Sequence, residues 1–174
     1  NLRWDRHFDV FNEFNIIPQY CFGCYKVQVE LKSILDFLRL YFIFDNIDLA
    51  ENNSRKCMIE LRTIAGGTYK GLIFCSGYKS AKTAQNILGK VLNKNIKGKL
   101  KIEIKRGCTE YGIEHPNYKV LDETSNDFMR YNNEWKKKEN IIDSNKSKYL
   151  RDLNAKRQNS LKGANLNDLL IINN

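Results

Sequence analysis

The chain has 174 residues, of which 42% are hydrophobic and 28% charged, and it carries a formal net charge of +9 at pH 7. This length predicts one domain, or one domain with an appendage, that is large enough to bury a hydrophobic core. No apolar run reaches the roughly 18–20 residues that a membrane-spanning helix needs. The sequence therefore predicts a protein without membrane contact. The chain begins with Asn1 rather than Met, which is typical of a fragment or a processed form.

The first elements predicted along the chain are a helix, a strand and a second helix. Residues 2–15 carry aromatic side chains at helical spacing, which predicts a short amphipathic helix, and Pro18 ends this segment. Residues 20–30 alternate between apolar and polar side chains, as a half-buried strand does. Residues 33–46 recur with the helical period, and Ser33 is the predicted N-cap.

The elements that follow show the same periodicities. They are strands over 56–62 and 68–76 with a turn at Gly66-Gly67, a helix over 81–95 capped by Ser80, and a strand over 99–106. The order is therefore β-α-β-β-α-β, which is that of the ferredoxin-like α+β fold. We expect a two-layer sandwich in which two helices cover one face of an antiparallel sheet with the strand order 4-1-3-2.

Beyond Gly107 the hydrophobic pattern weakens. Residues 108–119 are typical of an ordered loop, 123–140 predict a helix, 143–165 are polar and predict a helix or an arm, and the apolar patch 166–172 is expected to pack back onto other residues. The predicted divisions are an N-terminal helix (1–18), a ferredoxin-like α+β domain (19–120) and a C-terminal helical arm (121–174). We expect the arm to pack on a partner or on a second copy of the chain.

The cysteines are the main candidates for chemistry. Five cysteines in a chain without a secretory signal indicate reduced thiols in the cytoplasm. In the strand order 4-1-3-2, the starts of strands 1 and 2 and the ends of strands 3 and 4 lie at the same edge of the sheet. We therefore expect all five thiols to gather at one rim, namely Cys21, Cys24, Cys57, Cys75 and Cys108.

A thiolate rim of this kind predicts a bound zinc ion or an iron–sulfur cluster, because both are held by four thiolates. The C-x-x-C pair supplies two ligands, Cys75 and Cys108 are the preferred third and fourth, and Cys57 is the spare. His115 is an alternative ligand. A redox-active thiol pair and inert buried thiols are the competing interpretations.

The basic residues concentrate in one part of the sequence. Nine Lys or Arg and a single acid, Glu103, lie between Lys79 and Arg106. Such a cluster suits phosphate or an acidic protein partner, and a solvated lysine-rich surface is the alternative. The sequence thus favours a metal-binding α+β domain that docks on an acidic partner through the helix 81–95 and the strand 99–106.

The stretch Lys70 to Gly77 resembles the strand-3 signature of the RNA-recognition motif at Lys70, Gly71 and Phe74. It departs from that signature at Leu72 and Gly77, where base-stacking aromatic rings would lie, so the resemblance implies the fold and not the activity. Phosphate contacts do not need those rings, and a basic RNA-binding or ribonucleoprotein-associated domain is therefore the alternative function. The candidate contact residues are Lys70, Lys79, Lys82, Lys101, Lys105 and Arg106.

The sequence predicts no catalytic residue. It contains no Ser-His-Asp set, phosphate-binding loop, dinucleotide-binding loop or zinc-protease motif. Glu110, Glu114 and His115 form an acid–base set beside Cys108, but a local set without known geometry predicts no reaction.

Overall fold

The structure, a computed structural model, describes residues 4–61, 67–98 and 100–145. The chain divides into two compact units, one drawn from residues 1–16 and 133–174 and the other from residues 17–132. Within the described ranges, no helix has both the length and the hydropathy that a membrane span requires.

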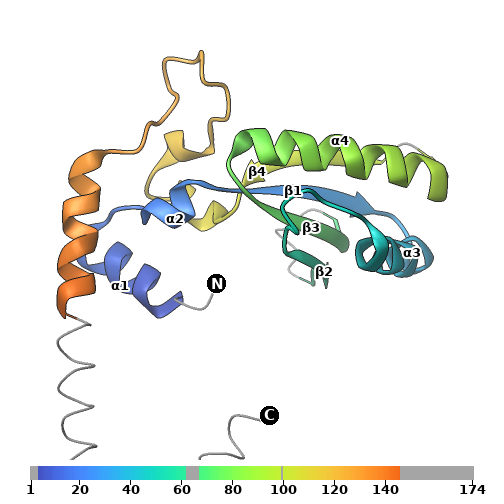
Figure 1. Cartoon of the computed structure of the whole chain (residues 1–174), viewed down its shortest axis with the longest axis horizontal. Helices are drawn as coiled ribbons and strands as arrows, with labels where there is room; N and C mark the ends of the chain where they lie inside the picture. The colour runs from blue at the N-terminus through green and yellow to red at the C-terminus, as the bar shows by residue number, and fades with distance from the viewer. Residues whose placement is uncertain (1–3, 62–66, 99, 146–174) are drawn as a thin grey trace, which may run out of the picture. The chain divides into compact units, whose positions relative to one another are not determined.

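The larger unit, residues 17–132, is built on a four-stranded antiparallel sheet (Figure 1). Its strands are β1 (Cys24–Leu31), β2 (Arg55–Ile59), β3 (Tyr69–Ser76) and β4 (Lys101–Arg106). They lie in the order β2-β3-β1-β4, which reads 4-1-3-2 from the β4 edge. Two helices pack on this sheet, α3 (Ile34–Asn46) and α4 (Tyr78–Asn95). The predicted α+β class and antiparallel sheet are confirmed.

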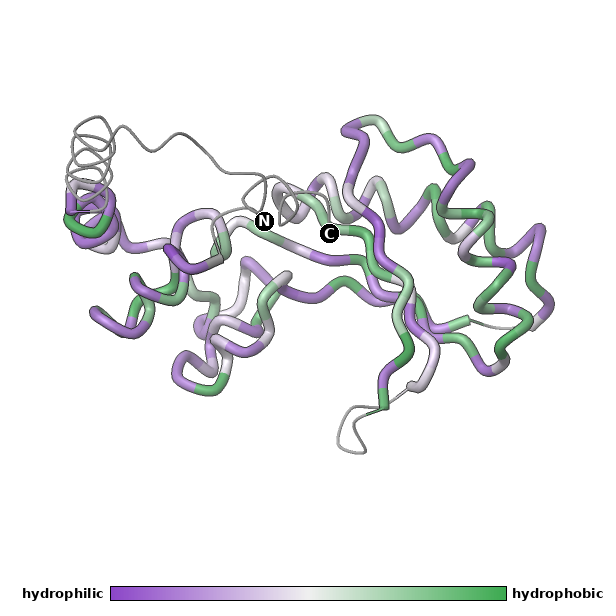
Figure 2. Tube along the Cα trace, turned by 90° about the horizontal axis from the view of Figure 1, so that it is seen from below, coloured by the Kyte–Doolittle hydropathy of each residue, from purple (hydrophilic) through white to green (hydrophobic). Residues whose placement is uncertain are grey.

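The alternation of β1 explains which face of the sheet becomes the core. Tyr25, Val27, Val29 and Leu31 point toward the helices and are at most 6% exposed. They pack with buried side chains of α3 and α4, and hydrophobic residues recur along these elements in Figure 2. Burying each such side chain contributes on the order of 1.5–3 kcal/mol, so this face supplies most of the stability of the unit.

The start of α3 follows the expected capping chemistry. The hydroxyl of Ser33 accepts a hydrogen bond from the backbone N–H of Asp36 at 3.1 Å, so the predicted N-cap is confirmed. Where α3 crosses the sheet, Gly71 of β3 permits a close approach. A Cβ atom at Gly71 would overlap Leu40 and lie 2.9 Å from the ring of Phe44.

The predicted strand 20–30 is wrong at its start. Residues Gln19–Phe22 form a helical turn, α2, and the strand begins only at Cys24. The turn closes through a 2.8 Å hydrogen bond from the N–H of Phe22 to the carbonyl of Pro18. Proline suits the start of a helix because it has no N–H to leave unpaired.

The predicted cap of the second sheet helix is also wrong. Helix α4 begins at Tyr78, and its N-cap is Gly77, whose φ of 120° favours glycine. Ser80 lies inside the first turn, where its hydroxyl donates to a carboxylate oxygen of Glu51 at 2.7 Å.

Two short 3-10 helices follow β4, namely η1 (Thr109–Gly112) and η2 (Pro116–Lys119). The predicted helix 123–140 is wrong in its first half, because residues 123–132 are irregular and helical structure begins at residue 133. The side chain of Asp122 accepts hydrogen bonds from the N–H and the hydroxyl of Thr124 at 3.0 and 2.7 Å. Such local bonds favour a turn over a helix.

The smaller unit pairs α1 (Trp4–Phe14) with a helix over residues 133–145. The guanidinium of Arg6 joins them through Glu139 at 2.8 Å and Asp143 at 2.6 Å. The helix predicted over 2–15 is thus confirmed over residues 4–14. The predicted apolar patch at 166–172 lies outside the described residues, as does the predicted polar segment beyond residue 145.

Candidate functional site: a buried arginine in an aromatic pocket, beside a cysteine cluster

The last residue of β4, Arg106, is a buried cation. It continues the alternation of Ile102 and Ile104 and therefore points toward the helix-covered side of the sheet. Its exposed fraction is only 2%. Arginine remains protonated in proteins, so a full positive charge lies inside this unit.

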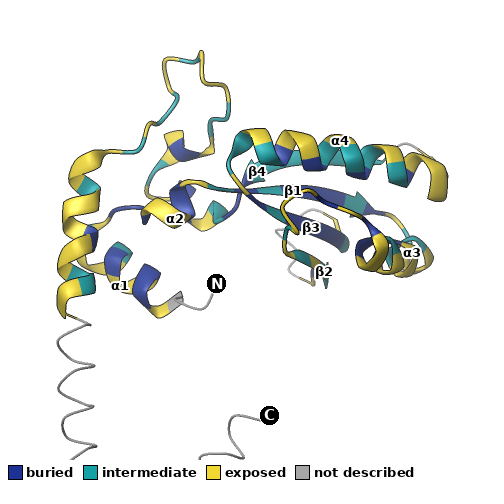
Figure 3. Ribbon diagram, viewed as in Figure 1, coloured by how far each residue is buried: buried dark blue, intermediate teal, exposed yellow. Residues whose placement is uncertain are grey.

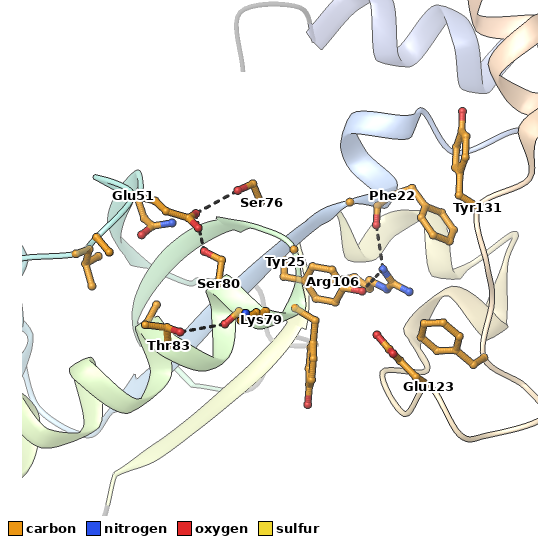
Figure 4. Close-up of a pocket in the computed structure, with 18 of the residues that line it drawn as sticks. Phe22, Tyr25, Glu51, Ser76, Lys79, Ser80, Thr83, Arg106, Glu123 and Tyr131 are labelled. Carbon is orange, nitrogen blue, oxygen red and sulfur yellow. Dashed lines mark hydrogen bonds between the residues drawn. The ribbon is translucent and has the colours of Figure 1, made fainter.

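The guanidinium of Arg106 binds three parts of the chain, and Figure 4 shows its bonds to Phe22 and Tyr25. Its Nε donates to the carbonyl oxygen of Tyr118 in η2 at 2.9 Å. Its Nη1 donates to the carbonyl oxygen of Phe22 in α2 at 2.9 Å and to the hydroxyl of Tyr25 in β1 at 2.6 Å. These acceptors hold the planar group in one orientation.

Aromatic rings surround the same guanidinium. Its Cζ atom lies 4.6 Å from the ring centre of Tyr25, 4.9 Å from that of Phe22, 5.0 Å from that of Tyr118 and 5.9 Å from that of Phe128. Contacts of a cation with ring faces are worth about 0.5–2 kcal/mol each, more where water is excluded. The rings therefore offset part of the cost of burying the charge.

One nitrogen of Arg106 remains unsatisfied. Its Nη2 is buried and has no hydrogen-bond partner, and no carboxylate among the described residues forms an ion pair with the guanidinium. A buried charge without a counterion costs several kcal/mol. The guanidinium therefore lacks an acceptor at Nη2.

A pocket of about 920 Å³ opens beside this group (Figure 4). Phe22, Tyr25, Phe128 and Tyr131 provide aromatic surface, and the first turn of α4 contributes to the opposite end. The charged residues that line the pocket are three cations and two carboxylates, which gives a net charge of +1: Arg106, Lys79, Arg130, Glu51 and Glu123. This balance suits one negative charge in a ligand.

Glu51 provides a hydrogen-bond acceptor at the α4 end of the pocket. Its carboxylate accepts hydrogen bonds from the hydroxyls of Ser80 at 2.7 Å and Ser76 at 3.1 Å. These bonds, that of Ser80 first, hold the pKa of Glu51 below its ordinary value. The group is therefore ionised at neutral pH.

Three cysteines form a second cluster close to Arg106. Cys21, at 1% exposed, is hydrogen-bonded to Cys108, and the hydroxyl of Tyr111 donates to its Sγ at 3.8 Å. The Sγ atom of Cys24 lies against Gly107, whose N–H donates to the carbonyl of Cys24 at 2.8 Å. The segments carrying these thiols are α2, the start of β1 and the link between β4 and η1.

The environment of this cluster keeps the thiols of Cys24 and Cys108 protonated. The hydrogen bond to Cys21 and then burial raise the pKa of Cys108 far above its ordinary value. Burial and the neighbouring Cys21 raise the pKa of Cys24 to about 11. A metal ion would therefore have to displace protons from these groups, because only the thiolate is a ligand.

The prediction that all five thiols share one rim is wrong for Cys57. Cys75 lies at the same end of the sheet as Cys24, and both line one pocket, but the two side chains are on opposite faces. Cys75 pairs with Tyr25 and joins the core on the helix-covered face, whereas Cys24 precedes Tyr25 and points to the opposite face. Cys57 pairs with Gly71, four residues along β3 from Cys75, or about 14 Å at the rise of a strand. Alternation and register, which a count of strand ends ignores, separate them.

The described residues contain no group of three or more His, Cys, Asp or Glu arranged to hold a metal ion. The alternative ligand His115 is the N-cap of η2, and its backbone N–H donates to the carbonyl of Tyr111 at 2.9 Å. The cysteine cluster thus offers three neighbouring thiols without preformed metal geometry.

The six predicted phosphate-binding residues do not share a surface. Lys101 and Lys105 pair with Glu103 at 2.8 and 3.0 Å on the uncovered face of the sheet. Lys70 is buried 4.0 Å from Glu60, and Arg106 points to the helix-covered side. The other two, Lys79 and Lys82, are exposed on α4.

Of the pocket residues, only Lys79 and Arg106 were predicted from the sequence, and as phosphate contacts on a surface; one signal for a buried Arg106 was present. Leu100, Ile102 and Ile104 are expected inward on the last strand, and the same alternation places Arg106 inward as well. A charged residue at an inward position is a departure from the pattern that marks a buried polar site.

Comparison with known protein families, with curated proteins and with solved structures finds no match to this chain.

Proposed function

We propose that residues 24–106 adopt the ferredoxin-like βαββαβ arrangement and act as a scaffold for a ligand-binding site. The order β1-α3-β2-β3-α4-β4 and the central position of β1 and β3 support this assignment. On such a scaffold the ends of β1 and β4, together with the segment that follows β4, form one edge. The pocket and the cysteine cluster both lie at that edge.

The proposed function is the binding of a small molecule that carries one negative charge on a flat apolar body. The observation that carries it is the buried, unpartnered Nη2 of Arg106 beside an aromatic pocket of about 920 Å³. Nη2 is the one guanidinium nitrogen without an acceptor, because Nε and Nη1 already bind protein oxygens, and a side-chain movement would open it to a ligand in the pocket. One anionic oxygen on Nη2 would supply the missing counterion, and the rings would cover the apolar body.

A carboxylate fits this site better than a phosphate. The net charge of the pocket-lining residues is +1, and Glu51 and Glu123 would repel a second negative charge. A phosphate monoester carries about −1.5 to −2 charges at neutral pH and offers three strong acceptor oxygens. The pocket has one buried donor nitrogen for them.

Calorimetric titration of the full chain with phenylacetate and with its neutral amide, phenylacetamide, tests this proposal. The two probes have the same shape and differ in charge. We expect phenylacetate to bind with a Kd of about 1 mM or tighter and the amide to bind at least tenfold more weakly. Inorganic phosphate should bind more weakly than phenylacetate. Equal binding of the two phenyl probes, or no binding of either, would contradict the proposal.

A second candidate function is the binding of a thiophilic ion such as zinc by Cys21, Cys24 and Cys108. The convergence of these three thiols from separate segments supports it. Three protein ligands leave the fourth tetrahedral position to water or to another molecule, as in catalytic zinc sites. An iron–sulfur cluster, the other predicted cofactor, requires four thiolates, and this cluster of cysteines supplies three.

Alkylation by iodoacetamide followed by peptide mass spectrometry tests the metal proposal. Zinc should protect Cys21, Cys24 and Cys108 and leave the reaction of Cys57 unchanged, and elemental analysis of freshly purified protein should find about one zinc per chain. Equal protection of all cysteines, or of none, would refute the site. Protection of the three cysteines by zinc, without any binding of phenylacetate, would support the metal site and contradict the anion site.

A further inference from the structure

Helix α3 exposes a second apolar surface. Its outward side chains are 46–64% exposed, although all are large and apolar: Ile34, Leu35, Leu38, Tyr41 and Phe42. They recur at intervals of three and four residues, which places them along one side of the helix. The opposite side packs on the sheet through Leu40 and Phe44. Figure 3 shows the exposed side of α3.

A helix that is apolar on both sides is normally covered on both. Scattered apolar residues on a surface need no explanation, but a contiguous stripe of this kind marks an interaction site. The ring of Tyr41 packs edge-on against that of Phe42, with ring centres 5.8 Å apart. This contact orders the two exposed rings of the stripe.

A groove lies next to this stripe. It has a volume of about 720 Å³ and runs between α3 and α4. Apolar side chains from both helices line it: Phe42, Ile43, Ile47, Ile87 and Val91. One face of the molecule thus carries both a protruding apolar stripe and a receiving apolar groove.

The charges on the two helices are complementary. Helix α4 has four lysines and no acidic residue, and its last turns carry Lys90 and Lys94. Helix α3 has two aspartates and one arginine, and its C-terminal end carries Asp45, followed by Asp48. An interface that sets the α3 end of one molecule against the α4 end of another brings opposite charges together.

We propose that the chain forms a twofold-symmetric homodimer through this α3–α4 face, with Leu38 and Phe42 of each copy packed on the groove of the other. A twofold interface uses the same patch on both subunits, so it requires the protrusion and the groove to coexist on one face, as they do here.

Sedimentation velocity of the full chain over roughly 1–100 µM tests the proposal. We expect a species of twice 20.4 kDa to predominate at the upper concentrations. Leu38→Glu and Phe42→Glu should each raise the dimer Kd by roughly 100-fold, because they place a charge in the apolar interface. The matched control is Ile113→Glu, at a residue 76% exposed and outside both helices, which should leave the Kd unchanged.

Charge reversal provides a second, independent measurement. Lys94→Glu should weaken the dimer about tenfold, and adding Asp45→Lys should restore it, because the opposite pair is re-formed across the interface. Both positions are exposed, so the variants should fold. A monomer at every concentration would overturn the proposal, and so would a dimer that both α3 substitutions leave intact.

Discussion

Arg106 contacts Tyr25 in two ways, since its Nη1 donates to the tyrosine hydroxyl at 2.6 Å and its Cζ lies 4.6 Å from the centre of the tyrosine ring. The hydroxyl and the ring thus act on the same cation, and they can be separated by substitution. Tyr25 is 6% exposed, so neither contact competes with bulk water.

The variant Tyr25→Phe removes the hydroxyl and keeps the ring. We expect the free energy of unfolding to fall by about 1–2 kcal/mol, because the lost hydrogen bond has a charged donor while Nη1 keeps its bond to Phe22. Urea denaturation measures this change. The control is Tyr78→Phe, whose ring packs on Tyr25 at 5.7 Å and which should shift stability by less than about 0.5 kcal/mol. Equal losses would show that the bond to Arg106 contributes nothing.

Glu123 is the exposed carboxylate on the side of the pocket that holds Arg106 (Figure 4). In Glu123→Gln the repulsion of a bound anion disappears, and we expect the Kd of phenylacetate to fall about threefold to tenfold, as measured by calorimetry. Asp127→Asn, an exposed change in the same loop but outside the pocket lining, should have no effect. Weaker phenylacetate binding to Glu123→Gln would instead assign Glu123 a role in holding the ligand.

The raised pKa of Cys24 makes stability depend on pH in the alkaline range. The folded state holds this proton up to a pKa of about 11, whereas an unfolded thiol loses it near 9.0. Between these values the folded state binds more protons, so its stability falls as pH rises. We expect a loss of roughly 1–2 kcal/mol between pH 8.5 and 10.5, after allowance for partial solvent screening.

Urea denaturation at several pH values measures this loss. Tyrosines and lysines also titrate in this range, so the readout is the difference between the wild-type protein and Cys24→Ser. The substituted protein should have a flatter profile. Parallel profiles would mean that Cys24 ionises as readily in the folded state as in the unfolded one.

Two glycines should respond in opposite ways to an added methyl group. Gly71→Ala places a Cβ against Leu40 and 2.9 Å from Phe44, and overpacking of this kind costs about 1–3 kcal/mol. Gly89 lies within α4, where a Cβ would meet only Ile102, at 3.8 Å. Gly89→Ala should therefore stabilise the protein by about 0.5–1 kcal/mol, through helix propensity. Thermal unfolding measures both, and a similar sign for the two would contradict the packing of α3 on β3.

Much of the larger unit could be predicted because its elements follow simple periods. The alternation of Val27 and Val29 identified β1, and the spacing of Leu40 and Phe44 belongs to a helix that packs on a sheet. The N-cap of α3, Ser33, could also be predicted, because its hydroxyl accepts a hydrogen bond from a backbone N–H only three residues away. These features depend on neighbours within a few positions of the sequence.

The candidate site could not be predicted in the same way, because its contacts join distant segments. Phe22 accepts from Arg106 across 84 positions, and Tyr118 donates to the carbonyl of Cys21 across 97. The sequence suggested a surface role for Arg106 because it follows a run of lysines. It suggested a shared rim for Cys57 because a strand end was placed without its register.

The bonds of Arg106 also bear on the order in which the chain folds. The residue becomes correctly placed only when β4 has paired with β1, since that pairing brings Arg106 opposite Tyr25. Its bond to Tyr118 then holds η2 against β4. We therefore expect residues 108–132 to become ordered after the sheet, with φ-values near zero at Tyr118, while those at Val27 are higher.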